Sequence, residues 1–159
     1  VDNKYRYSEI MSIMEKYWAI YNQDPKAAYV PQLLLRMADL YLYLYEEGAI
    51  IKKELNLTDS QLTDYFNKAN DLYKKIKREF PDSSAAQAIA YVIENVKVRE
   101  EPSSKSKVIK KIPAGTLVKI IDRSEQKQEI SNMYDYWFKV KLVSGLEGWV
   151  YGFYLRAQY

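Results

Sequence analysis

The sequence predicts an α+β protein in which N-terminal helical hairpins pack beside a small C-terminal β-barrel. Apolar residues in the first part recur three and four positions apart, which is the spacing of one face of a helix. From Asn95 onward the pattern changes to short alternating runs separated by turn residues, which is typical of strands. We therefore expect a helical domain over residues 1–93 and a barrel over residues 94–159.

Helical periodicity predicts the elements of the first domain. The segments are a helix within residues 1–23, a second over Val30–Tyr45, a third from Thr58 to about Phe80, and a short fourth over 84–90. The second segment is apolar on nearly all sides, which indicates a buried helix. Gly48 is expected to end that helix, because glycine favours helix C-termini.

Part of the third helix resembles the tetratricopeptide repeat. Ala69, Tyr73 and Pro81 match the second half of that repeat, and the stretch FNKANDLYKKIKREFPDSSAAQAIAY resembles helical repeats of bacterial envelope assembly proteins. Alanine lets two helices approach, the aromatic ring fills the groove, and proline ends the helix. The resemblance implies a surface for a protein partner, while a plain helical hairpin that packs its own core is the alternative.

The C-terminal part is predicted to form a small antiparallel barrel of five short strands. Val96-Lys97-Val98-Arg99 alternates with period two, and the segment 117–122 is β-branched and apolar, as buried strands are. The segment 136–143 alternates again, and the polar segment 124–135 before it is expected to be a loop. Several short strands within one small segment favour a barrel.

The stretches VKVREEPSSKSKVIKKIPAGTLVKII, YWFKVKL and GLEGWVYGFYL closely resemble the bacterial SH3 domain family. The resemblance covers residues 94–156 and includes the Val-Arg opening, the Gly-Thr-x-Val run, the Trp-x-x-Val strand and the closing Gly-Trp-Val with Tyr-Leu. One departure is Glu100-Glu101 before Pro102, where the family commonly has a small residue and glycine.

Aromatic residues of the barrel are the candidate ligand-binding groups. Exposed Trp and Tyr are rigid and amphipathic, which suits recognition of peptides and sugars. The SH3 resemblance implies that Trp137 and Tyr154 line a ligand groove, with Tyr136, Tyr151 and Tyr134 at its rim. Trp149 is instead expected to lie mainly in the core.

The composition argues against several other functions. The chain has no cysteine and no histidine, so a thiolate nucleophile, a Cys/His zinc site and a Ser-His-Asp triad are excluded. We therefore expect no enzyme, no catalytic residue, no cofactor and no metal. A net charge of +3 is too small to indicate a nucleic-acid partner. The longest apolar run, Leu33–Tyr45, contains Arg36 and Asp39, so no membrane span is expected.

The bacterial SH3 resemblance implies binding of cell-wall peptidoglycan, especially its peptide stems, while the helical part would bind a protein. Residues 94–159 carry 12 basic and 8 acidic side chains, which would favour an acidic stem peptide. The chain starts at Val1 without methionine, so we expect that a leader has been removed, either by natural processing or by artificial truncation. With the bacterial SH3 resemblance this implies an exported periplasmic or envelope protein, whose leader could have carried a lipid anchor. The alternatives are an adaptor that binds only proteins and an accessory part of a cell-wall hydrolase.

Overall fold

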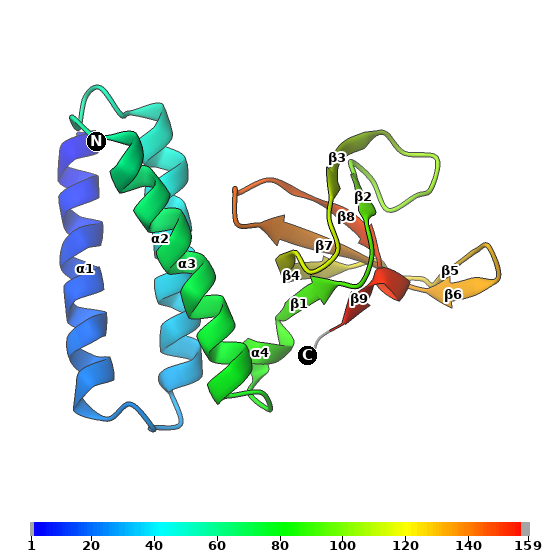
Figure 1. The fold of residues 1–159 in the computed structure, drawn as a ribbon, viewed down its shortest axis with the longest axis horizontal. Helices are drawn as coiled ribbons and strands as arrows, with labels where there is room; N and C mark the ends of the chain where they lie inside the picture. Colours follow the sequence, from blue (N-terminus) through cyan, green and yellow to red (C-terminus); the bar gives the residue numbers. More distant parts are fainter. Residues whose placement is uncertain (1, 157–159) are drawn as a thin grey trace. The chain divides into compact units, whose positions relative to one another are not determined.

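The computed structural model describes residues 2–156, which form two compact units (Figure 1). The first unit ends at Ala85 and the second begins at Ala86. Helices make up the first and antiparallel strands the second, which confirms the α+β class.

Three helices of 21 residues each form the first unit: α1 (Asn3–Gln23), α2 (Val30–Ile50) and α3 (Asp59–Glu79). Thr58 and Gln61 form a capping box at the start of α3, which pairs backbone groups that the first helical turn leaves free. The central helix α2 is the most buried of the three and packs most extensively against α3. The helical region that the apolar spacing predicts is thereby confirmed.

Residues of the repeat-like pattern lie at the contact between α2 and α3. Ala69 is fully buried, and the Tyr73 hydroxyl donates a hydrogen bond of 3.1 Å to the Asp39 carboxylate of α2. This packing is the one that the small and aromatic positions predict. Whether the pair acts as a tetratricopeptide repeat stays a prediction.

Gly48 does not end α2, which continues to Ile50. A Cβ at this position would lie 2.7 Å from Leu62 Cδ2 of α3, closer than real Cβ atoms come to their neighbours. Gly48 therefore permits close packing of α2 against α3 and does not terminate the helix.

The short helix after Pro81 is shorter than expected. Helix α4 spans only Ser84–Gln87, and Ile89–Val92 is strand β1, which pairs with β4 (Leu117–Arg123) and β9 (Leu155–Arg156). Ile89, Ala90 and Val92 are fully buried, so this apolar run is stabilised by the sheet.

A seven-stranded antiparallel sheet in the order β3-β2-β8-β7-β4-β1-β9 forms the second unit. Its other strands are β2 (Val96–Arg99), β3 (Val108–Ile112), β7 (Trp137–Leu142) and β8 (Glu147–Tyr151). Because β3 and β9 are the two ends of this order, the sheet is not closed by strand pairing. The small barrel expected from five short strands is thus a β unit with more strands, whose main sheet does not close.

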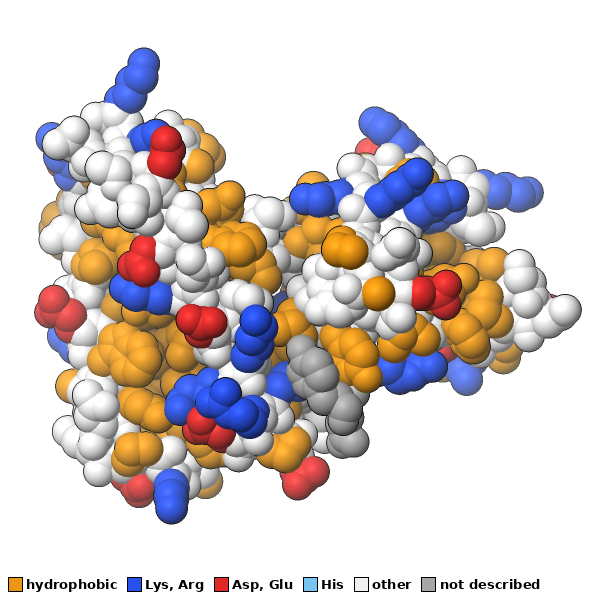
Figure 2. All heavy atoms as spheres, viewed as in Figure 1, with side chains coloured by type: hydrophobic (Ala, Val, Ile, Leu, Met, Phe, Trp, Pro, Cys, Tyr) orange, Lys and Arg blue, Asp and Glu red, His pale blue; other side chains and the backbone are white. Residues whose placement is uncertain are grey.

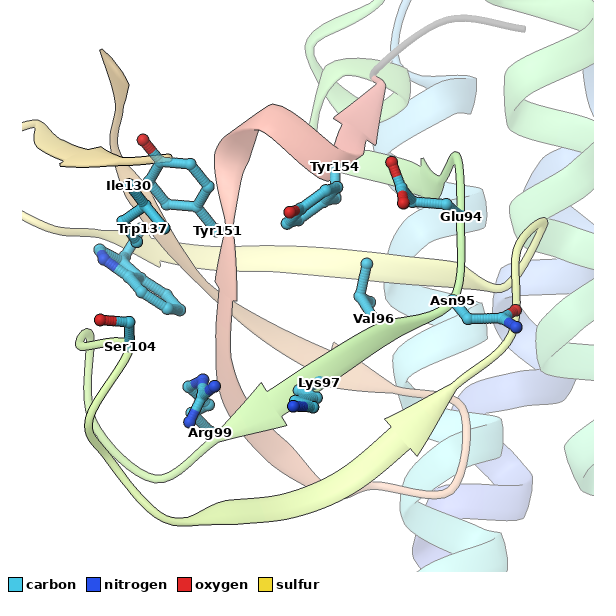
Figure 3. Close-up of a pocket in the computed structure, with 10 residues that line it drawn as sticks. All are labelled: Glu94, Asn95, Val96, Lys97, Arg99, Ser104, Ile130, Trp137, Tyr151 and Tyr154. Atoms are coloured by element: carbon cyan, nitrogen blue, oxygen red, sulfur yellow. The ribbon is translucent and has the colours of Figure 1, made fainter. Parts of the chain in front are cut away.

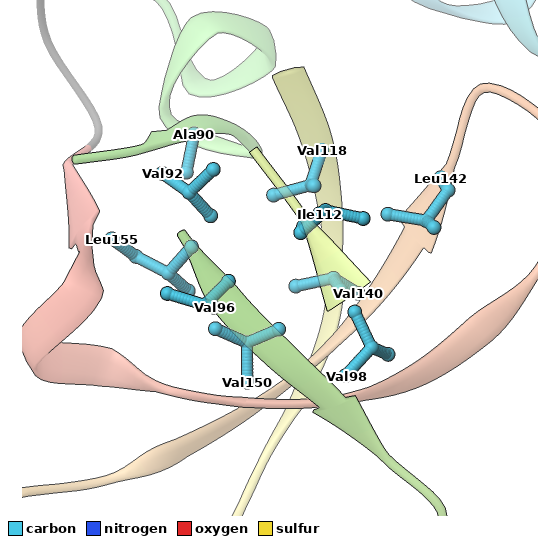
Figure 4. Packing of buried hydrophobic residues seen from close by; sticks show 10 residues of the cluster. All are labelled: Ala90, Val92, Val96, Val98, Ile112, Val118, Val140, Leu142, Val150 and Leu155. Atoms are coloured by element: carbon cyan, nitrogen blue, oxygen red, sulfur yellow. The ribbon is translucent and has the colours of Figure 1, made fainter. Parts of the chain in front are cut away.

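Branched aliphatic side chains fill the interior of this unit (Figure 4). The cluster consists of Ala90, Val92, Val96, Val98, Ile112, Val118, Val140, Leu142, Val150 and Leu155. Each Val, Leu or Ile side chain of this cluster stabilises the fold by about 1.5–3 kcal/mol when fully buried. Gly148 of β8 lets β2 pass closely, since a Cβ there would lie 2.5 Å from Val98 Cγ1 and 2.9 Å from the Arg99 carbonyl oxygen.

The segment predicted as a polar loop contains a hairpin, formed by β5 (Gln128–Ile130) and β6 (Met133–Asp135). Ser131 and Asn132 between them have φ of 51° and 63°. Two consecutive positive φ values are those of a tight type I′ hairpin turn, in which asparagine is favoured. Asn132 favours such a turn, but the polar composition of the segment does not by itself distinguish a hairpin from a loop.

Candidate ligand-binding site

A pocket of about 260 Å³ opens on the second unit (Figure 3). Its lining comes from β2 and the residues before it, the β2–β3 loop, the β5 strand, and the chain from β7 to the residues after β8. The lining residues are Glu94, Asn95, Val96, Lys97, Arg99, Ser104, Ile130, Trp137, Tyr151 and Tyr154.

The pocket exists because β2 separates from β8. Strand β2 pairs with β3 along its whole length, from Val96 to Arg99, but it pairs with β8 only at Arg99 opposite Trp149. The β8 side of β2 before Arg99 therefore borders the pocket instead of a neighbouring strand. A strand edge of this kind can form main-chain hydrogen bonds with an extended peptide.

Trp137 and Tyr151 form the aromatic floor of the pocket. They face each other across β7 and β8, with ring centroids 5.3 Å apart, and are only 2% and 3% exposed. The Trp137 Nε1 group donates to Gln128 Oε1 at 2.8 Å, which fixes the indole. A ligand can reach the edges of these rings but cannot surround them.

The Tyr151 hydroxyl also holds the β5–β6 hairpin in place. It accepts a hydrogen bond from the Asp135 amide at 2.9 Å and lies 2.6 Å from the Gln128 carbonyl oxygen and 2.9 Å from that of Met133. Burial raises the pKa of this hydroxyl above its ordinary value, so it stays protonated and can donate.

Tyr154 forms the accessible aromatic wall. Its ring is half-buried, and its centroid lies 6.2 Å from that of Tyr151. The corner before it depends on Gly152, whose amide donates to the Tyr136 carbonyl oxygen at 2.7 Å and where a Cβ would lie 2.7 Å from Phe138 Cε2. Within residues 2–156 the Tyr154 hydroxyl has no hydrogen-bond partner, so it is available to a ligand.

Charged side chains of both signs surround the aromatic floor. The Arg99 guanidinium donates to the Ser106 carbonyl oxygen and is thereby held at the pocket. The Glu94 and Lys97 side chains are exposed, and neither has a hydrogen-bond or ion-pair partner in the described part of the chain. In Figure 3 Glu94 lies beyond Tyr154, at the far side of the aromatic row from Trp137.

Three of the five aromatic residues selected from the sequence meet in this pocket: Trp137, Tyr151 and Tyr154. Tyr136 and Tyr134 are not among its lining residues. Tyr136 instead packs under Arg123, whose guanidinium carbon lies 4.2 Å from the ring centroid, and Tyr134 is 67% exposed.

Trp149 lies outside the buried core in which it was expected. It is partly exposed on the outer face of the sheet, opposite Arg99 of β2 and Lys139 of β7. Its neighbour Val150 takes the core position, because successive strand residues point to opposite faces.

The charged groups Glu94, Lys97 and Arg99 were not selected from the sequence. The alternation of Val96-Lys97-Val98-Arg99 does indicate that both cations leave the core face. The sequence alone does not indicate that β2 parts from β8 there, which depends on long-range pairing.

No group of three acidic side chains that could hold a metal ion occurs within residues 2–156. None of the helices in that range has the length and apolar character needed to cross a membrane. The groups that line the pocket are aromatic rings, main-chain groups and charged or polar side chains.

Comparison with protein families matches residues 94–156 to the bacterial SH3 domain. No curated protein and no solved structure matched the chain. The matched range contains strands β2 to β9, and all of them lie in the second unit described above. The same range holds every residue of the pocket. The C-terminal part of this chain, residues 94–156, is a bacterial SH3 domain that follows a helical region.

Proposed function

We propose that the protein is a non-enzymatic cell-envelope binding protein whose SH3 domain recognises the peptide part of peptidoglycan. The observation that carries the proposal is the pocket, in which an unpaired stretch of β2, an aromatic floor and free charges meet. These three features correspond to the main chain, the aliphatic side chains and the charged groups of a short peptide.

Main-chain groups of an extended peptide can pair with the open side of β2, while its aliphatic side chains pack on Trp137, Tyr151 and Tyr154. Peptidoglycan peptides also carry free carboxylate and amino groups. Lys97 and Glu94 supply one partner of each sign at the pocket.

The composition of the pocket supports binding rather than catalysis. Hydrolysis of a glycan by carboxylates uses a pair of them, one on each side of the bond. Glu94 is the single carboxylate among the residues that line this pocket. The chain also has no histidine or cysteine that could act as a general base or nucleophile.

The helical unit is proposed to bind a protein partner. Large apolar side chains remain on its surface: Tyr5, Ile20, Tyr29 and Ile50, with Ile50 77% exposed. Together with peptidoglycan recognition this implies an exported protein of the periplasm or cell envelope, for which a lipid anchor remains part of the proposal.

Co-sedimentation with purified peptidoglycan tests the wall-binding claim. We expect the wild-type chain to sediment at low salt and Tyr154→Ala to remain in solution, because Tyr154 is the accessible aromatic wall. Tyr134→Ala is the matched control, since it removes an exposed tyrosine of the same domain outside the pocket. Lys97→Glu is a second pocket variant at an exposed position, which keeps the test valid if Tyr154→Ala unfolds.

A wild-type chain that stays in solution would overturn wall binding and leave the protein-only adaptor. Release of soluble fragments from the wall by the intact chain would overturn the non-enzymatic assignment and favour the hydrolase.

A further inference from the structure

Two lysines of the SH3 domain face each other without an acidic partner. Lys97 of β2 and Lys111 of β3 are direct partners in the antiparallel register, and both are exposed. Neither side chain has a hydrogen-bond or ion-pair partner within the part of the chain that the structure describes. Their neighbours Val96 and Val98 point into the core, so the two lysines share the outer face.

Like charges at directly opposite positions destabilise a sheet, because the Cβ atoms of such a pair are only about 4.5–5.5 Å apart. A lysine on an edge strand is common, since it prevents pairing with another chain. That reason applies to Lys111, because β3 is the end of the sheet, and also to Lys97, because β2 does not pair with β8 before Arg99. It accounts for a lysine on each strand, but it does not account for their position as direct partners.

The surroundings of this pair are also positive. Residues 94–112 carry six basic and three acidic side chains. Figure 2 shows Lys and Arg side chains gathered over the β2–β3 hairpin. Lys97 itself lines the pocket, so the positive region and the aromatic floor belong to one surface.

We infer that the pocket selects a peptide with a free carboxylate group, which Lys97 and Lys111 bind together. The inference rests on the proposed recognition of peptidoglycan peptides and adds that the site recognises a free carboxylate group of the peptide. A carboxylate placed between the two ammonium groups removes their mutual repulsion. The rest of the peptide extends over the aromatic floor towards Tyr154 and Glu94, where an amino group finds an acidic partner.

The test compares two forms of one peptide on the intact chain. The probe is the stem-type tetrapeptide Ala-γ-Glu-Lys-Ala, either with free carboxyl groups or with the same groups amidated. Affinity is measured by NMR or calorimetric titration at low salt. An exposed ion pair contributes about 0.2–1 kcal/mol, and the carboxylate forms two of them. We therefore expect the free acid to bind the wild-type chain roughly two- to thirtyfold more tightly than the amide.

Variants that remove one positive charge show which lysines cause the preference for the free acid. Lys97→Gln and Lys111→Gln should each bring the two affinities closer together, and the double variant should make them equal. Lys110→Gln is the matched control, because Lys110 lies next to Lys111 on the same strand but is paired with the core residue Val98. This control removes the same charge and should keep the preference for the acid.

Two results would overturn the inference, and they are distinguishable. If acid and amide bind the wild-type chain equally and Tyr154→Ala weakens both, the peptide pocket stands and the carboxylate selection is wrong. If neither form binds and the chain does not sediment with the wall, the proposed function itself is wrong.

Discussion

Replacement of Tyr151 by phenylalanine should loosen the β5–β6 hairpin without changing the shape of the pocket floor. The ring that faces Trp137 at 5.3 Å is retained, and only the hydroxyl is removed. That hydroxyl is the shared hydrogen-bond partner of the Asp135 amide and of the carbonyl oxygens of Gln128 and Met133. Its loss leaves these groups of both hairpin strands without that partner.

The expected magnitude follows from burial. Tyr151 is 3% exposed, and removal of one partner from a buried hydrogen bond costs about 1–3 kcal/mol. Water can reach part of the hairpin, because Gln128 is exposed, so we expect a loss of about 1–2 kcal/mol. A loss of this size raises the open fraction of the hairpin by a factor of roughly 5–30.

Hydrogen exchange of the Asp135 amide measures the effect at the residue concerned, and denaturant unfolding of the intact chain measures it globally. Tyr134→Phe is the control, because Tyr134 lies on the same hairpin but is 67% exposed. We expect it to change stability by less than about 0.5 kcal/mol. Unchanged exchange of the Asp135 amide in Tyr151→Phe would refute the role given to the hydroxyl.

Two further variants test the packing and the electrostatics. Gly148→Ala should destabilise the SH3 domain by about 1–3 kcal/mol, because the added Cβ would lie within 2.9 Å of Val98, Ile109 and the Arg99 carbonyl oxygen. A chemical-denaturation midpoint equal to that of the wild type would contradict this prediction. Burial lowers the pKa of Lys77 from 10.5 to about 8 in the folded chain. Between these two pH values the unfolded chain binds more protons than the folded chain, so the free energy of unfolding should rise with pH from about 8 upward. Lys77→Met should lack that rise, and parallel stability curves for the two proteins would show that the lysine is not the cause.

The helices were predictable because their signals are local. Apolar spacing predicts a helix from Thr58, within about a residue of the observed start of α3 at Asp59. The end of α2 was not predictable from Gly48, since the same glycine serves a helix stop or a close helix contact. Only the position of Leu62 on α3 distinguishes the two.

The candidate site was predictable in part. Aromatic enrichment and the SH3 resemblance select Trp137, Tyr151 and Tyr154, and the structure brings these three together. The same reasoning selects Tyr134 and Tyr136, which the structure places outside the pocket. All five occur in one short stretch of sequence, so composition cannot separate them.

By itself the sequence determined the period of each segment, and with it which parts are helix or strand and which strand residues share a face. The tertiary structure alone decided that Ile89–Val92 joins the sheet, that the sheet stays open, and that β2 parts from β8 before Arg99. Periodicity follows from backbone geometry over a few residues, whereas strand pairing depends on contacts between residues far apart in the chain. The pocket and the facing lysines Lys97 and Lys111 depend on this long-range strand pairing.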